Sequence, residues 1–209
     1  MRNHRSALAG ALISVLLVVP AFATVGHPDN LSDEGLHQTG WTIDKLQFEG
    51  AGIRGVRRLT ATGRFNLPAK SVWQAIAYDN KSDWPSVSET VVESHIGDTV
   101  IARYKISVPI VRDRRYRLRI VNDDARMEEV FRQVPGYGNV RAINGFWKLT
   151  PISDSVTRAD YLLDTDPGVR LVPGFIIDWA TKRVVPGVYE QVYKIASRNV
   201  INPDLTRSR

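Results

Sequence analysis

Histidine and cysteine are the residue types that most often bind metals or act as catalytic groups, and this sequence offers few of them. His27, His37 and His95 stand far apart, with no His-x-x-x-His or His-Glu-x-x-His spacing. The chain has no cysteine, which excludes disulfides, thiolate metal sites and cysteine nucleophiles. No Gly-x-Ser-x-Gly elbow is present either. We therefore expect no metal and no cofactor, and we favour a non-enzymatic protein over an enzyme.

One glycine pattern resembles a nucleotide site. Residues Gly50 to Gly55 read Gly-Ala-Gly-Ile-Arg-Gly, which matches G-x-G-x-x-G. That motif needs a following helix whose N-terminus meets the pyrophosphate. The residues that follow, Val56 to Phe65, have the spacing of a strand, so we interpret the glycines as a turn.

The charged clusters of the sequence are interpreted as solvent-exposed side chains. The acid pairs Asp123-Asp124 and Glu128-Glu129 flank a predicted hairpin turn and are expected to be solvated. Arginines crowd around Tyr116, at positions 112, 114, 115, 117 and 119. The pattern favours the solvated face of a strand over a nucleic-acid site, and transient docking on anionic lipid headgroups stays open.

Aromatic side chains are the better candidates for binding. Tyr104 and Tyr116 lie on the apolar faces of two alternating runs, and Phe175 and Trp179 are spaced like neighbours on a helix. Arg103, Asp113 and Arg158 are possible polar anchors, or members of ordinary ion pairs. The candidate ligand-binding residues are Tyr104, Tyr116, Phe131, Trp147, Arg158, Tyr161, Phe175 and Trp179.

The elements that position these residues follow from hydrophobic periodicity. Trp41 to Phe48 and Val56 to Phe65 are predicted strands, and Leu67-Pro68-Ala69 begins a helix with one apolar face. From Val87 to Asp166 the period is two, and turn residues separate the runs. Short connections between alternating runs predict antiparallel strands with one buried face.

The chain ends in a predicted amphipathic helix that begins near Pro173. Its apolar stripe includes Ile177, Val184 and Ile195, and Pro186 should kink it or divide it in two. The order predicts an α+β fold with a curved antiparallel sheet of about six or seven strands wrapped around the helix. Incomplete filling between helix and sheet would leave a cavity.

Several segments resemble the START and polyketide-cyclase (SRPBCC) superfamily with its helix-grip fold. Val108 to Tyr116 resembles its segment in which a proline precedes an Arg-Asp pair. Gly145 to Pro151 resembles Gly-x-Trp-x-Leu-x-Pro, and Asp166 to Gly168 resembles the turn before the last helix. Ala69 to Trp84 is similar to the early helix, and the resemblance runs from about Leu59 to Asn199.

The resemblance implies a hydrophobic cavity that holds a lipid or other apolar small molecule, with the final helix as a lid. Three functions stay open: lipid binding or transfer, a polyketide cyclase or dehydratase using the same cavity, and an interaction module with a filled core. We expect no nucleic-acid partner, and the sequence does not indicate the oligomeric state.

The N-terminal segment points to export. Arg2 and Arg5 precede an apolar stretch from Ala7 to Val19, and Ala21-Phe22-Ala23 has the pattern of a cleavage site. We therefore expect a signal peptide at 1–23 and a secreted or periplasmic protein. The rest divides into a leader at 24–52, a START-like domain at 53–200 and a tail at 201–209. The whole chain has a net charge of +6.

Overall fold

The computed structural model describes the backbone of residues 36–50, 56–77, 87–107, 113–168 and 174–201, and their side chains except at 36–38 and 174–184. The predicted signal peptide, the glycine turn at 51–55 and the segment around Pro109 lie outside these residues. The elements are β1 (Leu36–Gln38), β2 (Trp41–Glu49), β3 (Arg57–Phe65), α1 (Ala69–Ala77), β4 (Val87–Ile96), β5 (Thr99–Ile106), β6 (Arg114–Asp123), β7 (Glu128–Gln133), β8 (Ala142–Ser153), β9 (Val156–Asp166) and α2 (Gly174–Ile201).

One antiparallel sheet contains every strand of the described residues, in the order β1-β2-β3-β9-β8-β7-β6-β5-β4. It has nine strands, more than the six or seven expected, because β1 and β2 extend it beyond β3 and β4 forms the opposite edge. Strands β4 to β9 pair as successive hairpins, and β9 then pairs with β3. Strand β9 thereby connects strands β1 to β3 with the series of hairpins from β4 to β8.

The expected leader at 24–52 does not stay apart from the sheet. Its strand β2 pairs with β3, and its side chains Trp41 and Ile43 are 3% and 1% exposed. The prediction of a strand at 41–48 is confirmed. Strands β2 and β3, which stand on either side of the expected boundary at residue 53, pair with each other and contribute to the same core.

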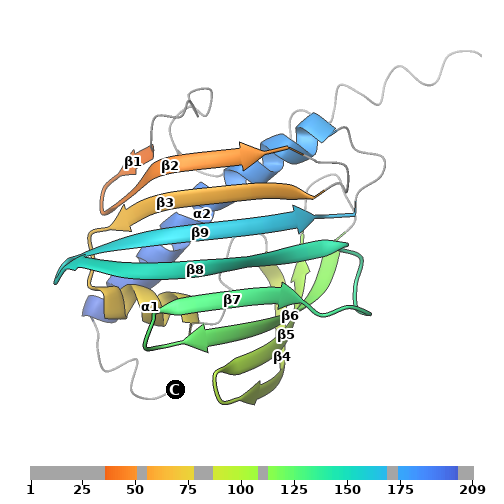
Figure 1. The fold of residues 1–209 in the computed structure, drawn as a ribbon, viewed down its shortest axis with the longest axis horizontal. Coiled ribbons are helices and arrows are strands. Elements are labelled where there is room, and N and C mark those ends of the chain that lie inside the picture. The colour runs from red at the N-terminus through yellow and green to blue at the C-terminus, as the bar shows by residue number, and fades with distance from the viewer. Residues whose placement is uncertain (1–35, 51–55, 78–86, 108–112, 169–173, 202–209) are drawn as a thin grey trace, which may run out of the picture.

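The helices lie on one side of the curved sheet, with α2 crossing behind it in Figure 1. Helix α1 buries Val72, Trp73 and Ile76, as the apolar spacing predicts. Helix α2 is a single helix of 28 residues with Pro186 inside it, so it is not divided in two. Within the described residues, no helix combines the length and the apolar character needed to cross a bilayer.

Candidate functional site

Strand alternation places a pair of tyrosines on the inner face of the sheet, the face toward the helices. Tyr104 of β5 and Tyr116 of β6 stand directly opposite each other in the register. Their rings are stacked with centroids 5.4 Å apart, and both side chains are buried. Cross-strand aromatic pairs of this kind stabilise a sheet and present one continuous apolar surface.

Strands β7 to β9 extend this surface. Trp147 and Tyr161 are register partners with ring centroids 4.5 Å apart, and Phe131 lies 6.5 Å from Tyr161. Gly145 makes room for Phe131, because a Cβ at residue 145 would lie 2.5 Å from the Cζ atom of that ring. We call Tyr104, Tyr116, Phe131, Trp147 and Tyr161 the aromatic wall.

A buried carboxylate accompanies the wall. Glu129 is 1% exposed and pairs in the register with Trp147 on one side and Asn122 on the other. The expectation that it is a solvated strand charge is wrong. The alternation of the strand predicts this burial, because Glu129 precedes Phe131 by two residues and therefore shares its face. Asp124 is exposed in the turn, as expected, and it also accepts a hydrogen bond of 2.8 Å from the Trp73 indole.

The three wall tyrosines are neutral hydrogen-bonding groups. Burial raises the pKa of Tyr104, Tyr116 and Tyr161 well above the ordinary value, and the charge of Glu129 raises the pKa of Tyr104 and Tyr161 further. No hydrogen bond between described residues involves the three phenol hydroxyls. Each hydroxyl can therefore donate to, or accept from, a polar atom brought to the wall.

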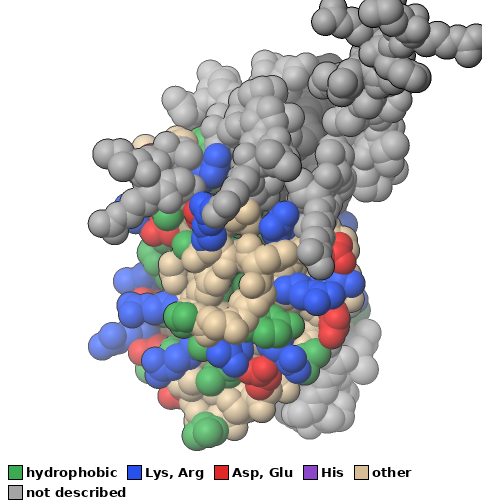
Figure 2. Space-filling view, turned by 90° about the vertical axis from the view of Figure 1, so that its right-hand side faces the viewer, with side chains coloured by type: hydrophobic (Ala, Val, Ile, Leu, Met, Phe, Trp, Pro, Cys, Tyr) green, Lys and Arg blue, Asp and Glu red, His purple; other side chains and the backbone are tan. Residues whose placement is uncertain are grey.

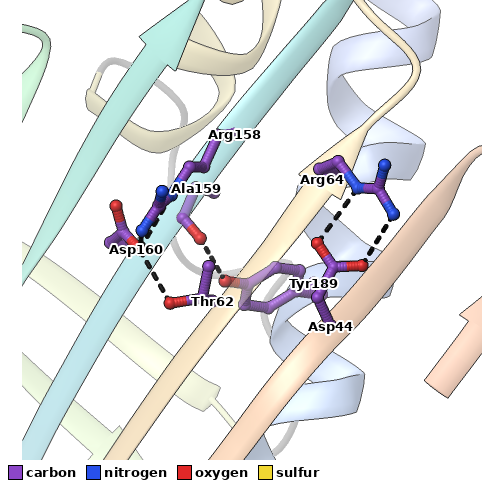
Figure 3. A network of polar contacts seen from close by, with 7 residues as sticks. All are labelled: Asp44, Thr62, Arg64, Arg158, Ala159, Asp160 and Tyr189. Atoms are coloured by element: carbon purple, nitrogen blue, oxygen red, sulfur yellow. Dashed lines mark hydrogen bonds and ion pairs between the residues drawn. The ribbon is translucent and has the colours of Figure 1, made fainter. Parts of the chain in front are cut away.

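Arg158 does not belong to this wall, which corrects the sequence prediction. It lies three positions from Tyr161 on β9, so the two side chains point to opposite faces. Its side chain is 51% exposed and forms a 3.0 Å ion pair with Asp160. Figure 3 shows Asp160 also accepting a hydrogen bond of 2.8 Å from Thr62.

The two other possible anchors also form ion pairs away from the wall. Arg103 pairs with Glu93 at 2.8 Å, and Asp113 pairs with Lys105 at 3.0 Å. The hydrogen bond from Lys105 and then its charge hold the pKa of Asp113 below its usual range, with smaller contributions from Ser107 and Arg115. Ordinary ion pairing, the alternative considered from sequence, therefore accounts for both residues.

A second aromatic cluster fills the other part of the inner face. Tyr189 of α2 stacks on Phe65 with ring centroids 5.2 Å apart, and Trp41 lies 6.1 Å away. The Tyr189 hydroxyl donates a 2.9 Å hydrogen bond to the carbonyl oxygen of Ala159 (Figure 3). Gly63 allows this packing, because a Cβ there would lie 2.7 Å from the ring. We call Trp41, Phe65 and Tyr189 the Tyr189 cluster.

The predicted apolar stripe of α2 is buried where the structure describes its side chains, as at Ile195, but the buried face is wider than predicted and includes Tyr189, which sequence reasoning missed. The most buried line of this helix is Val185, Tyr189, Val192 and Ala196, each 0% exposed. Phe175 and Trp179 lie on the first turns of α2, and their side chains are outside the description. Their role in ligand binding stays a prediction. Among the described residues, no group of acids and histidines is arranged to hold a metal ion.

Comparisons with known proteins support the fold. No family model and no curated protein matches the sequence. The crystal structure of the Zhui aromatase/cyclase from Streptomyces sp. R1128 matches with a TM-score of 0.60 and 19% identity, over 69% of this chain and 96% of that one. Human STARD10 matches with a TM-score of 0.56 and 14% identity, over 82% and 79% of the two chains.

A bacterial structure carries the same likeness. The STAR-related lipid transfer protein from Xanthomonas axonopodis matches with a TM-score of 0.53 and 15% identity, over 73% of this chain and 98% of that one. Together with the antiparallel sheet and the final helix, these matches agree with the resemblance seen in the sequence. The chain therefore has the helix-grip fold of the START and aromatase/cyclase (SRPBCC) structures.

Proposed function

We propose that this domain binds a lipid or another hydrophobic small molecule between the aromatic wall and helix α2. The observation that carries the proposal is a buried wall with five aromatic rings, three of which bear neutral hydroxyls without a hydrogen bond to a described residue. Burying apolar ligand surface there is favourable by about 25 cal/mol per Å². The hydroxyls and Glu129 would orient the polar end of the ligand.

The structural neighbours support a hydrophobic ligand without naming it. One of them is called a lipid transfer protein and another an aromatase/cyclase. Both names suit a fold that encloses an apolar molecule. We place lipid binding or transfer first, because the wall is mainly apolar.

Export is part of the proposal. The sequence of residues 1–23 supports a signal peptide, and a ligand carrier would then work outside the cytoplasm. Mass spectrometry of the mature protein tests this, because cleavage after Ala23 makes Thr24 the first residue. A mature protein that retains Met1 in the cytoplasmic fraction would contradict it.

Native mass spectrometry of the protein purified from its own host tests ligand binding. We expect an added mass that dissociates on activation and extracts into organic solvent. The variant Tyr161→Ala should lose this mass, and Arg158→Ala should keep it, because the two residues lie on opposite faces of β9. A bare wild-type protein that also takes up no lipid or quinone in a broad screen would contradict the proposal.

A second candidate is a cyclase or dehydratase of aromatic polyketides in the same place. The observation that favours it is Glu129, a buried carboxylate that acts electrostatically on the phenols of Tyr104 and Tyr161. Such groups can transfer protons when a substrate lies against them. Turnover of an aromatic polyketide that Glu129→Gln abolishes while binding persists would establish it. Binding without turnover in the wild type would retire it.

A further inference from the structure

The outer face of the sheet carries cations directly opposite one another. Lys105 faces Arg115, and Arg103 faces Arg117, across the pairing of β5 with β6. On the next pair of strands, Arg119 faces Arg132. Like charges in directly opposed positions destabilise a sheet, so three such pairs side by side are not explained by folding.

Nearby carboxylates compensate only part of this charge. Glu93 forms ion pairs with two arginines, with one oxygen 2.8 Å from Arg103 and the other 3.7 Å from Arg117. Asp113 pairs with Lys105 at 3.0 Å. The remaining arginines of the opposed pairs are Arg115, Arg119 and Arg132, which are exposed and have no ion pair with a described residue.

A groove opens on the same face. It has a volume of about 230 Å³ and is lined by Glu89, Val91, Arg103, Lys105, Arg115 and Tyr137. Tyr104, whose ring is buried on the inner face, also borders the groove, because it stands between Arg103 and Lys105 on β5. The guanidinium carbon of Arg103 lies 5.4 Å from the centre of the Tyr137 ring, a cation–π contact that holds both side chains at the groove. Arg103, Lys105 and Arg115 therefore line this hollow together with Glu89, and of the three cations Arg115 is the one without an ion pair to a described residue.

The other half of the outer face has a different charge arrangement. Arg58 pairs with Asp164, Arg64 with Asp44, and Arg158 with Asp160, all at 3.0 Å or less. Each of these arginines has its own carboxylate, so excess charge is not a general property of this sheet. Figure 2 shows another side of the molecule, the right-hand side of Figure 1, and there Lys and Arg side chains predominate over Asp and Glu.

We propose that this basic face docks on an anionic phospholipid bilayer, with a headgroup phosphate in the groove. We define the basic face as Arg103, Lys105, Arg115, Arg117, Arg119 and Arg132. Neighbouring strands lie about 4.8 Å apart, so the cations spread over β5 to β7 and match several headgroups rather than one small anion. Anionic leaflets attract such clusters electrostatically.

An apolar side chain at the adjoining edge favours a bilayer over a nucleic acid. On edge strand β4, Ile96 is 78% exposed and pairs with Thr99, which shares the face of Arg103. An aliphatic group at this position can enter the acyl boundary of a bilayer and would gain nothing from a phosphodiester chain. The proposal goes beyond ligand binding and is independent of it, because the aromatic wall lies on the opposite face of the sheet.

Vesicle flotation tests the docking. The probes are phosphatidylcholine vesicles and vesicles in which about one third of the lipid is phosphatidylglycerol, at low salt where such attraction is least screened. We expect the wild type to float only with the anionic vesicles. The triple variant Arg115→Gln/Arg119→Gln/Arg132→Gln should bind them about 100-fold more weakly, since each cation contributes roughly fivefold.

A matched control separates this face from total charge. The triple variant Arg58→Gln/Arg64→Gln/Arg158→Gln removes the same charge from the other half of the sheet and should keep most of the binding. Equal loss in both variants would overturn the proposal. Should the first variant melt early, the double variant Arg119→Gln/Arg132→Gln serves, with an expected loss of about 25-fold.

Competition identifies the partner chemistry. Inorganic phosphate at matched ionic strength should leave most of the vesicle binding intact, because one anion cannot replace contacts spread over three strands. Complete displacement by phosphate would reduce the site to a single-anion pocket and overturn bilayer docking. Tighter binding to single-stranded DNA than to the anionic vesicles would also overturn it.

Discussion

The two aromatic regions of the inner face differ in how their polar atoms are satisfied. In the Tyr189 cluster, the hydroxyl of Tyr189 donates to the Ala159 carbonyl, and its ring stacks on Phe65. In the aromatic wall, Tyr104, Tyr116 and Tyr161 are buried but 5–8% exposed, against 0% for Tyr189, and their hydroxyls form no hydrogen bond with a described residue. A fully buried polar group usually has a partner, as the Tyr189 hydroxyl does, whereas the wall hydroxyls do not occur among the fully buried unpartnered atoms of the described residues.

This difference separates side chains that stabilise the fold from side chains that are available to a ligand. The Tyr189 cluster joins helix α2 to strands β2, β3 and β9 through close packing and one buried hydrogen bond. The wall has the same apolar character with hydroxyls left available, as a surface for a ligand with a polar end would have. Trp147 connects the two regions, with its ring 4.5 Å from Tyr161 and 5.3 Å from Tyr189.

Removing the Tyr189 ring should give the largest effect. We expect Tyr189→Ala to lower the free energy of unfolding by about 3–5 kcal/mol, because it leaves a cavity among fully buried side chains of the core. Tyr189→Phe keeps the ring and should cost about 1 kcal/mol for the lost hydrogen bond. Urea unfolding measures the loss of unfolding free energy in each variant. Equal losses for Tyr189→Ala and Tyr189→Phe would show that the packing of the ring does not stabilise this cluster.

Alkaline pH should destabilise the fold through both regions. Burial raises the pKa of Tyr104, Tyr116, Tyr161 and Tyr189 above the unfolded value of about 10. The folded state therefore holds these protons more tightly, and its stability is complete below about pH 10 and falls above it. Each such tyrosine adds a slope of about 1.4 kcal/mol per pH unit.

Ultraviolet absorbance during an alkaline titration measures this coupling. Four of the seven tyrosines should ionise only together with unfolding, as judged by circular dichroism. Wall tyrosines that ionise reversibly near pH 10 in the folded protein would show that their surroundings are wet. That result would weaken the comparison with Tyr189.

Removing wall hydroxyls should affect binding more than stability. The double variant Tyr116→Phe/Tyr161→Phe should keep the free energy of unfolding within about 0.5 kcal/mol, because no hydrogen bond with a described residue is lost. Affinity for a ligand with a polar end should fall about tenfold, the effect of one or two hydrogen bonds. Isothermal titration measures the affinity, and a loss of stability like that of Tyr189→Phe would contradict the assignment.

The outer face gives the smallest expected effect. Arg158→Ala removes an exposed ion pair with Asp160, and such pairs contribute about 0–1 kcal/mol. We expect thermal unfolding and ligand affinity both to stay close to the wild type. A clear loss of affinity in this variant would restore Arg158 to the binding site.

Much of the fold follows from local periodicity. Alternation predicted the strands that carry Tyr104 and Tyr116, and the same period assigns Glu129 to the face of Phe131. The sequence prediction placed Arg158 with Tyr161 in the binding site, although residues three positions apart on one strand point to opposite faces. Tyr189 required the exact rotation of α2, which the sheet decides by packing. The pairing of β3 with β9 joins residues far apart in sequence, so no local pattern reveals it.

Photo-crosslinking with a diazirine-bearing fatty acid tests most directly whether the aromatic wall binds an apolar ligand. After irradiation and digestion, we expect the label on peptides that carry Tyr104, Tyr116 or Tyr161, with competition by excess unlabelled lipid. The Tyr189 cluster should stay unlabelled, because its packing leaves no room beside Gly63. Label that spreads over the exposed edge at Ile96 and spares the wall would contradict the account.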